Sequence, residues 1–242
     1  MKSFTPRSLS LPTFTLLREG APVLPHLSRF SRAADQYRSL VIQLEERHRG
    51  ADGRGYVVAV TSCEESAGKT LTSLNLALTL ASTWDRKVLL VEGDLWRPAM
   101  TEYLELDSAR PGVIQILRSE TTLRDAVIPV RERGPGAENT GVEVLPAGPS
   151  SVSDDLIAGS RAEPFLEEIR QHYRTIVIDC PPGDVASGRS LVSRADSVVV
   201  VVRAGRTRRS RIEATLTTLG PHKHLGFLLN AVKEADAVGY YS

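Results

Sequence analysis

The sequence is poor in the features that staple, anchor or export a chain. Cysteine occurs only twice in 242 residues, as Cys63 and Cys180, which excludes a disulfide framework. The longest purely aliphatic run, residues 198–202, is far shorter than the roughly 18–20 apolar residues of a membrane helix. No continuous apolar segment follows Lys2 and Arg7, so we expect no secretory signal and a soluble, cytoplasmic protein.

Neither sign of charge is in excess. Lys and Arg total 30 and Asp and Glu total 29, which gives a formal net charge of +1. This balance argues against a dedicated nucleic-acid binder, and we expect no nucleic-acid partner. A local basic run, residues 203–211, contains no aromatic side chains and is typical of a solvated helix face. Contact with acidic lipid or an acidic partner segment is the alternative interpretation.

Composition divides the chain into three regions. Residues 1–34 hold five Lys or Arg, one acid and four prolines, which predicts an extended or disordered basic arm. An arm that wraps the domain or docks on a membrane or partner is the alternative. Residues 35–230 are long enough to bury a substantial core and are predicted to form one domain. Residues 231–242 are predicted to be a flexible tail that carries tyrosines.

Within residues 35–230, apolar strands alternate with amphipathic helices. Strands are expected at 56–62, 87–94, 142–148, 174–179, 196–203 and 226–230. Helices are expected at 35–49, from 69 to about 82, at 160–173 and around 212–219, and a polar loop at 131–141. This alternation predicts an α/β fold with a doubly wound, mostly parallel sheet and helices on both faces.

A phosphate-binding loop is predicted directly after the first of these strands. Residues 63–70 read CEESAGKT, so Gly-Lys-Thr opens a helix behind an apolar strand, although Cys63 replaces the first glycine of the full pattern. Lys69 would place a charge at the β- and γ-phosphates and Thr70 a hydroxyl on Mg²⁺. The backbone N–H groups of the loop would contact the β-phosphate, and its residues there are Ser66, Ala67 and Gly68.

Acidic side chains follow two further strands. Glu92 and Asp94 end the strand at 87–94, and Asp179 ends the strand at 174–179. Because the carboxyl ends of parallel strands share one edge, we expect these acids to face the loop that holds Lys69. There they could bind Mg²⁺ and accept a proton from a nucleophile. The alternative for a single strand-end Asp is a helix cap.

The ordered set of segments resembles the bacterial tyrosine kinases (BY-kinases) of capsule and exopolysaccharide systems. The matching segments are DQYRSL (35–40), TSCEESAGKT (61–70), VLLVEGDLWRP (88–98), VLPAG (144–148), TIVIDCPP (175–182) and the terminal Tyr240-Tyr241. They correspond in order to the family's helix motif, Walker A, Walker A′ and Walker B segments and tyrosine cluster.

The resemblance implies a P-loop NTPase fold and a tyrosine autokinase with ATP and Mg²⁺ as cofactors. By match, the catalytic and metal-binding set is Lys69, Thr70, Glu92, Asp94 and Asp179. Asn230, at the end of the last strand, is assigned to the nucleotide edge. The phosphoacceptors would be Tyr240 and Tyr241 of a neighbouring subunit in a homo-oligomer. A membrane-embedded polysaccharide co-polymerase would activate this free-standing kinase and hold it at the inner face of the cell membrane.

Several positions depart from the family pattern. Glu92 stands where the family has Asp, and we expect Glu92→Asp to preserve or raise activity. The pair Ser66-Ala67 replaces the commoner Gly-Glu, Gly188 replaces an expected Asp, and Val41 replaces an Arg that supports ring assembly. A catalytically weak nucleotide-binding scaffold for the export machinery is therefore a second hypothesis. A partition or division-site positioning ATPase is a third, which Glu64 disfavours because that class has a Lys there.

Overall fold

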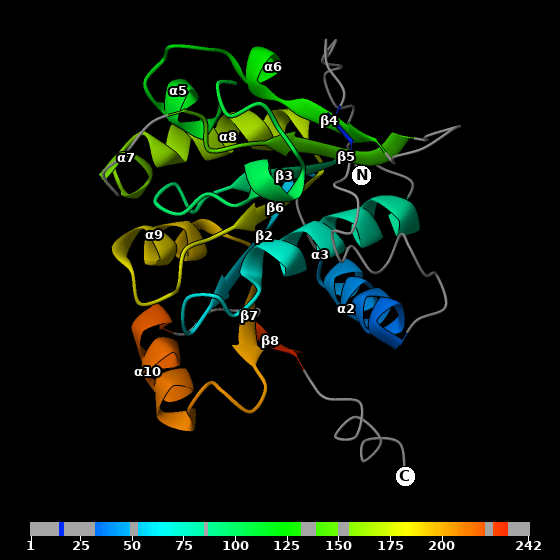
Figure 1. Ribbon diagram of the computed structural model, residues 1–242, viewed down its shortest axis with the longest axis vertical. Coiled ribbons are helices and arrows are strands. Elements are labelled where there is room, and N and C mark those ends of the chain that lie inside the picture. The colour runs from blue at the N-terminus through cyan, green and yellow to red at the C-terminus, as the bar shows by residue number, and fades with distance from the viewer. Residues whose placement is uncertain are drawn as a thin grey trace.

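The computed structural model describes residues 15–16, 32–48, 53–84, 87–131, 139–149, 155–220 and 225–231. They form an eight-stranded sheet in the order β1-β4-β5-β3-β6-β2-β7-β8 with helices on both faces (Figure 1). All neighbouring strands are parallel except the antiparallel pair β4 and β5. The predicted doubly wound, mostly parallel sheet is confirmed. The strands are β1 (Thr15–Leu16), β2 (Tyr56–Ser62), β3 (Val88–Glu92), β4 (Ile128–Arg131), β5 (Asn139–Leu145), β6 (Thr175–Asp179), β7 (Ser197–Arg203) and β8 (Leu225–Asn230).

Two hydrophobic layers enclose the sheet. Alternate residues of β2 pack on opposite faces of the sheet: Val57 belongs to one hydrophobic cluster and Val58 to the other. One face is covered by α2 (Arg32–His48), α3 (Lys69–Trp84) and α4 (Met100–Tyr103). The other is covered by α5 (Val113–Leu117), α6 (Leu123–Ala126), α7 (Asp155–Ala158), α8 (Ala162–His172), α9 (Ala186–Arg194) and α10 (Arg209–Leu219). Burial on both sides explains why the central strands read as uninterrupted apolar runs.

Some elements differ from the sequence-based expectation. β4, the short helices α4 to α7 and the nine-residue helix α9 were not expected, and β5 begins at Asn139, inside the expected polar loop. Pairing with β4 holds this polar start, because the Thr140 hydroxyl donates to the Val130 carbonyl at 2.8 Å. In the expected arm, Thr15 and Leu16 pair with β4 and α2 begins at Arg32. The rest of residues 1–31 and the tail from 232 lie outside the described residues.

The departures from the family pattern at positions 41 and 188 have packing reasons. Val41 is fully buried with Leu44 between α2 and α3. A Cβ atom at Gly188 would lie 2.4 Å from the Pro182 carbonyl oxygen, so α9 can start this close to the end of β6 only with glycine there. Among the described helices, none has the length and apolar character needed to cross a bilayer.

Restoring the family's basic residue at position 41 should destabilise the domain. Val41→Arg buries an uncompensated charge, and we expect it to lower the free energy of unfolding by about 3 kcal/mol or more. Its neighbour Ile42 is 55% exposed, so Ile42→Arg is the matched control and should change that free energy by less than about 0.5 kcal/mol. Urea unfolding followed by circular dichroism measures both. Equal losses in the two variants would contradict the packing of α2 on α3.

Candidate nucleotide and phosphotransfer site

The loop between β2 and α3 has the conformation of an anion cradle. Two of its residues, Ser66 (φ 55°) and Gly68 (φ 96°), are left-handed, which turns successive backbone N–H groups toward one side. Helix α3 begins at Lys69, so the positive end of its dipole lies at this loop. The left-handed region favours glycine, so Ser66 stores about 1 kcal/mol of strain. Cys63, in place of the first glycine, is fully buried in the core.

The side chain of Asn230 holds this loop through a backbone carbonyl group. Its Nδ2 atom donates to the Ala67 carbonyl at 2.8 Å, and its Oδ1 atom accepts from the Ala231 N–H at 2.8 Å. A Cβ atom at Gly68 would lie 2.1 Å from Asn230 Nδ2, so the contact requires glycine. The structure places Asn230 at the expected edge, and there it contacts the loop backbone.

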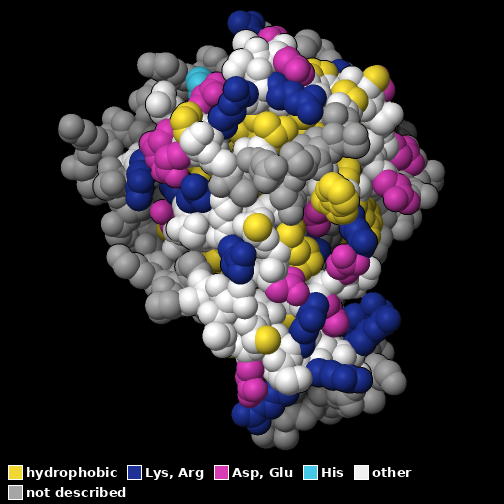
Figure 2. Space-filling view, turned by 90° about the vertical axis from the view of Figure 1, so that its left-hand side faces the viewer, with side chains coloured by type: hydrophobic (Ala, Val, Ile, Leu, Met, Phe, Trp, Pro, Cys, Tyr) yellow, Lys and Arg dark blue, Asp and Glu magenta, His cyan; other side chains and the backbone are white. Residues whose placement is uncertain are grey.

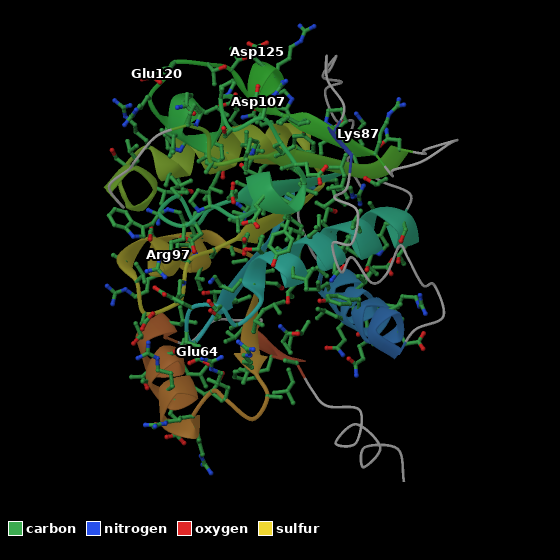
Figure 3. All side chains as sticks on the ribbon, in the orientation of Figure 1. Glu64, Lys87, Arg97, Asp107, Glu120 and Asp125 are labelled. Carbon is green, nitrogen blue, oxygen red and sulfur yellow. The ribbon has the colours of Figure 1, made fainter. Side chains whose placement is uncertain are left out.

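The segment from β7 to α10 braces the other end of the loop. The Glu64 carboxylate accepts from the Thr207 hydroxyl at 2.6 Å, and Arg211 Nε donates to the Cys63 carbonyl at 3.0 Å. Figure 3 shows Glu64 beside the start of α10. Sequence reasoning missed this role, because the basic run 203–211 was interpreted as a solvated helix face. Its partners lie more than 140 residues away in the chain, so no local pattern could reveal them.

The predicted aspartates converge on Lys69. Asp94 Oδ2 lies 4.0 Å from Lys69 Nζ, and Asp94 Oδ1 accepts from the Arg97 N–H at 3.1 Å. Asp179, at the end of β6, is buried and accepts from the Ser73 hydroxyl at 3.2 Å. Both carboxylates therefore lie near the N-terminus of α3, as expected if the carboxyl ends of parallel strands share one edge of the sheet.

Burial raises the pKa of the Asp179 carboxyl to about 7, against the opposing effects of the Thr70 hydroxyl and the Lys69 charge. A carboxyl with this pKa can accept a proton near neutral pH. Because the unfolded chain has the ordinary Asp value, the folded protein holds the extra proton between about pH 4 and 7. The contribution of Asp179 to the free energy of unfolding therefore falls as the pH rises from about 4 to about 7.

Glu92 has different partners from those expected. Its Oε1 atom accepts from the N–H groups of Ala99 at 2.5 Å and Met100 at 2.7 Å, and its Oε2 atom accepts from the Ala147 N–H at 3.0 Å. Burial raises the pKa of Glu92, while these three donors oppose the shift. The longer side chain thus ties the start of α4 to the loop after β5. Its expected catalytic role stays a prediction.

A cavity of about 720 Å³ opens beside these groups. It is lined by Glu65, Ser66, Gly68, Lys69, Thr70, Leu71, Asp94, Trp96, Arg97, Ala99, Tyr103, Pro181, Pro182 and Val185. Figure 2 looks onto this edge of the molecule, where hydrophobic and charged side chains mix and Lys and Arg gather at the lower end, over α10. The predicted acceptors Tyr240 and Tyr241 lie outside the described residues.

The Gly68–Asn230 contact can be tested by substitution. Gly68→Ala adds a clash with Asn230 and places alanine at φ 96°, so we expect MgATP affinity to fall at least tenfold. In Gly68→Ala with Asn230→Ala the clash disappears but the strain remains, so affinity should lie between the wild type and Gly68→Ala. Titration calorimetry with Asn230→Ala as the control measures each step. Wild-type affinity in Gly68→Ala would contradict this loop geometry.

The contacts of Glu92 reverse the expectation for Glu92→Asp. The shorter side chain cannot reach all three buried N–H groups, and each unsatisfied group costs about 1–3 kcal/mol. We therefore expect Glu92→Asp to lower the free energy of unfolding and the turnover together, and the isosteric Glu92→Gln to lose less stability. Urea unfolding and phosphotransfer assays of both variants decide this. Higher activity in Glu92→Asp would restore the original expectation.

Comparison with known proteins places the chain in a family. The AAA domain family matches residues 55–220. The putative tyrosine-protein kinase CapB of Staphylococcus aureus is 29% identical over 186 residues, which cover 75% of this chain and 78% of CapB. The succinoglycan biosynthesis transport protein ExoP of Rhizobium meliloti is 27% identical over 220 residues, which cover 88% of this chain and 26% of ExoP. The solved VpsO kinase domain has a TM-score of 0.68 at 30% identity and covers 82% of this chain and 95% of its own.

The resemblance seen in the sequence is thereby confirmed. The chain spans about a quarter of the length of several curated relatives. The family match nevertheless covers most of the chain and runs through the phosphate loop and both strand-end aspartates. The chain belongs to the AAA domain family and, within it, to the bacterial tyrosine kinases of capsule and exopolysaccharide systems.

Proposed function

We infer that this chain is an ATP-dependent protein-tyrosine kinase that regulates exopolysaccharide or capsule synthesis and export. One observation carries this conclusion. Lys69, Asp94 and Asp179 converge at the opening of α3 in a chain of the bacterial tyrosine kinase family. A cation, a hydroxyl and two carboxylates at a phosphate-binding loop are the groups that phosphoryl transfer needs.

The residues present fit MgATP. The N–H groups of Ser66, Ala67 and Gly68 would bind the β-phosphate, and Lys69 would neutralise charge at the β- and γ-phosphates. Among the described residues no cluster of three or more His, Cys, Asp or Glu forms a metal site by itself. This suits Mg²⁺, which binds through one or two carboxylates together with substrate phosphates. Thr70, Asp94 and Asp179 would hold the ion, which neutralises phosphate charge when bound.

Proton transfer falls to the strand-end aspartates. A tyrosine hydroxyl that attacks the γ-phosphate must lose its proton, and Asp179 has a pKa near neutrality through burial. Asp94 Oδ2 lies 4.0 Å from the Lys69 ammonium and would assist the metal. Asp94 would thus serve the ion alone, whereas Asp179 would serve both the ion and the proton.

The proposal extends to partners and location. We propose that a transmembrane polysaccharide co-polymerase activates this kinase and keeps it at the inner face of the cell membrane. The relative named as a succinoglycan biosynthesis transport protein supports a link to polysaccharide export. In a homo-oligomer, Tyr240 and Tyr241 of one subunit would reach the site of the next.

A nucleotide-binding scaffold is the second candidate. It is favoured by Glu92, whose two oxygens are engaged by backbone N–H groups, so that only Asp94 and Asp179 of the three predicted acids are directed to Lys69. The positioning ATPase is disfavoured further. That class has a Lys at position 64, whereas the Glu64 carboxylate here accepts from the Thr207 hydroxyl of the same chain.

Phosphotyrosine formation tests the kinase. We expect wild-type protein with MgATP to become phosphorylated on Tyr240 and Tyr241. Lys69→Met and Asp179→Asn should each lower the rate at least 100-fold, because they remove the phosphate charge and the proton acceptor. Lys87→Met is the matched control, since Lys87 lies at the opposite edge of the sheet (Figure 3) and pairs with Glu143. Anti-phosphotyrosine detection with mass mapping measures all four proteins.

The tail variant separates the acceptor from the enzyme. Tyr240→Phe with Tyr241→Phe should abolish most autophosphorylation and leave MgATP binding intact. Wild-type phosphotyrosine in that variant would place the acceptors elsewhere. Tight MgATP binding without any phosphotyrosine in wild-type protein, even with its activator, would establish the scaffold function instead.

A further inference from the structure

An exposed tryptophan stands at the phosphotransfer cavity. Trp96 is 67% exposed, the highest value among the exposed large hydrophobic side chains of the described residues. It also lines the cavity that contains Lys69, Thr70 and Asp94. A single exposed apolar side chain is ordinary, but an indole left in water at the wall of a reaction site is a surface on which a ligand can pack.

The backbone that carries Trp96 is held at both ends. Before it, Leu95 is buried, and Asp94 Oδ1 accepts from the Arg97 N–H at 3.1 Å. After it, Glu92 binds the N–H groups of Ala99 and Met100 at the start of α4. The exposure of the indole is therefore not the result of a loose segment. A surface fixed in advance loses little entropy when a ligand packs on it.

An ion pair joins the same segment to the phosphate loop. Arg97 Nη1 contacts the Glu65 carboxylate across the cavity mouth. Figure 3 shows Arg97 at the edge of the sheet where the loop lies. The position of Trp96 is thus set relative to the loop that takes the phosphates.

In-line phosphoryl transfer brings the acceptor hydroxyl into the cavity that holds the phosphates. The loop N–H groups would bind the β-phosphate, and Lys69, which lies 4.0 Å from Asp94, would contact the β- and γ-phosphates. The attacking and leaving oxygens lie roughly in line, so the acceptor approaches the γ-phosphate from the side away from the β-phosphate. The aromatic residues that line this cavity are Trp96 and Tyr103, and Trp96 follows Asp94 by two residues in the chain.

We propose that Trp96 is the aromatic platform on which the ring of the acceptor tyrosine stacks while its hydroxyl reaches the γ-phosphate. The proposal rests on the kinase function and names the residue that selects its acceptor. Stacked aromatic pairs favour a phenol ring over the short side chains of Ser and Thr. A cavity of about 720 Å³ lies within the size range of small-molecule sites, so it can hold a phenol ring as well as the phosphates.

Kinetics with an exogenous acceptor test the assignment. With a Glu-Tyr copolymer as substrate, we expect Trp96→Ala to raise the KM for the copolymer about three- to tenfold. The KM for MgATP should change less than twofold, and Trp96→Phe should recover most of the loss. Ile42→Ala removes a comparably exposed side chain outside the cavity and should change neither constant. An unchanged copolymer KM in Trp96→Ala, or a rise in the MgATP KM alone, would overturn the proposal.

Fluorescence separates this proposal from the kinase function. The chain has two tryptophans, so in Trp84→Phe the emission comes from Trp96 alone. With Mg²⁺ and a non-hydrolysable ATP analogue present, a tyrosine peptide should change that emission, and the same peptide with Ser for Tyr should not. A response in protein that shows no phosphotransfer would retain the platform and reject the kinase. If the protein is an active kinase but the tyrosine peptide leaves the Trp96 emission unchanged, the proposed role of Trp96 is wrong.

Discussion

The parallel pairing of β6 between β3 and β2 is the constraint on which the site depends. Asp179 is the register partner of Glu92 on one side and of Val60 on the other. Because the three strands point the same way, the phosphate loop and both acidic segments must leave the sheet at one edge. The approach is close: Gly93 N donates to the Asp179 carbonyl at 2.8 Å, and a Cβ atom at Gly93 would lie 3.0 Å from that oxygen. Backbone packing, more than side-chain reach, therefore sets the distance between the acids and the loop.

The same edge shows how a polar loop can be rigid before any ligand binds. A loop that turns its N–H groups toward a phosphate turns carbonyl groups elsewhere, and these need donors. Asn230 supplies one to Ala67 and Arg211 supplies one to Cys63. Both donors come from the end of the chain beyond β7, so the phosphate loop is completed only when the last parallel strand and helix have packed. Nucleotide binding is in this way coupled to the folding of the whole sheet.

The sequence predicted the parts of the molecule whose signals are local. β2 was predicted to the residue, because a strand buried on both faces is an uninterrupted apolar run, and Gly-Lys-Thr placed the start of α3 at Lys69. The helices α4 to α7 were missed, because four or five residues cannot display a helical period. α9 was also missed, because its buried face contains only two large apolar residues, Leu191 and Val192, beside Ser187 and Gly188. In the site, the residue types of the motif were found, but the partners of Glu92 and Arg211 were not. Arg211–Cys63 and Glu92–Ala147 join segments far apart in the chain, and the nearby Ala99 and Met100 N–H groups meet Glu92 only through the turn that follows β3.

Glu92 shows what a departure from a motif can mean physically. The longer side chain lets the carboxylate accept from the backbone N–H groups of residues 99, 100 and 147. The segment that carries Trp96 thereby gains a buried anchor. The proposed reaction needs one acid for the metal and one for the proton, and Asp94 and Asp179 cover both tasks. The charges of Glu92 and Asp94 both add to the effect of burial in raising the pKa of Asp179. Glu92 therefore leaves the two aspartates for the proposed reaction and acts through the backbone of the segment that carries Trp96.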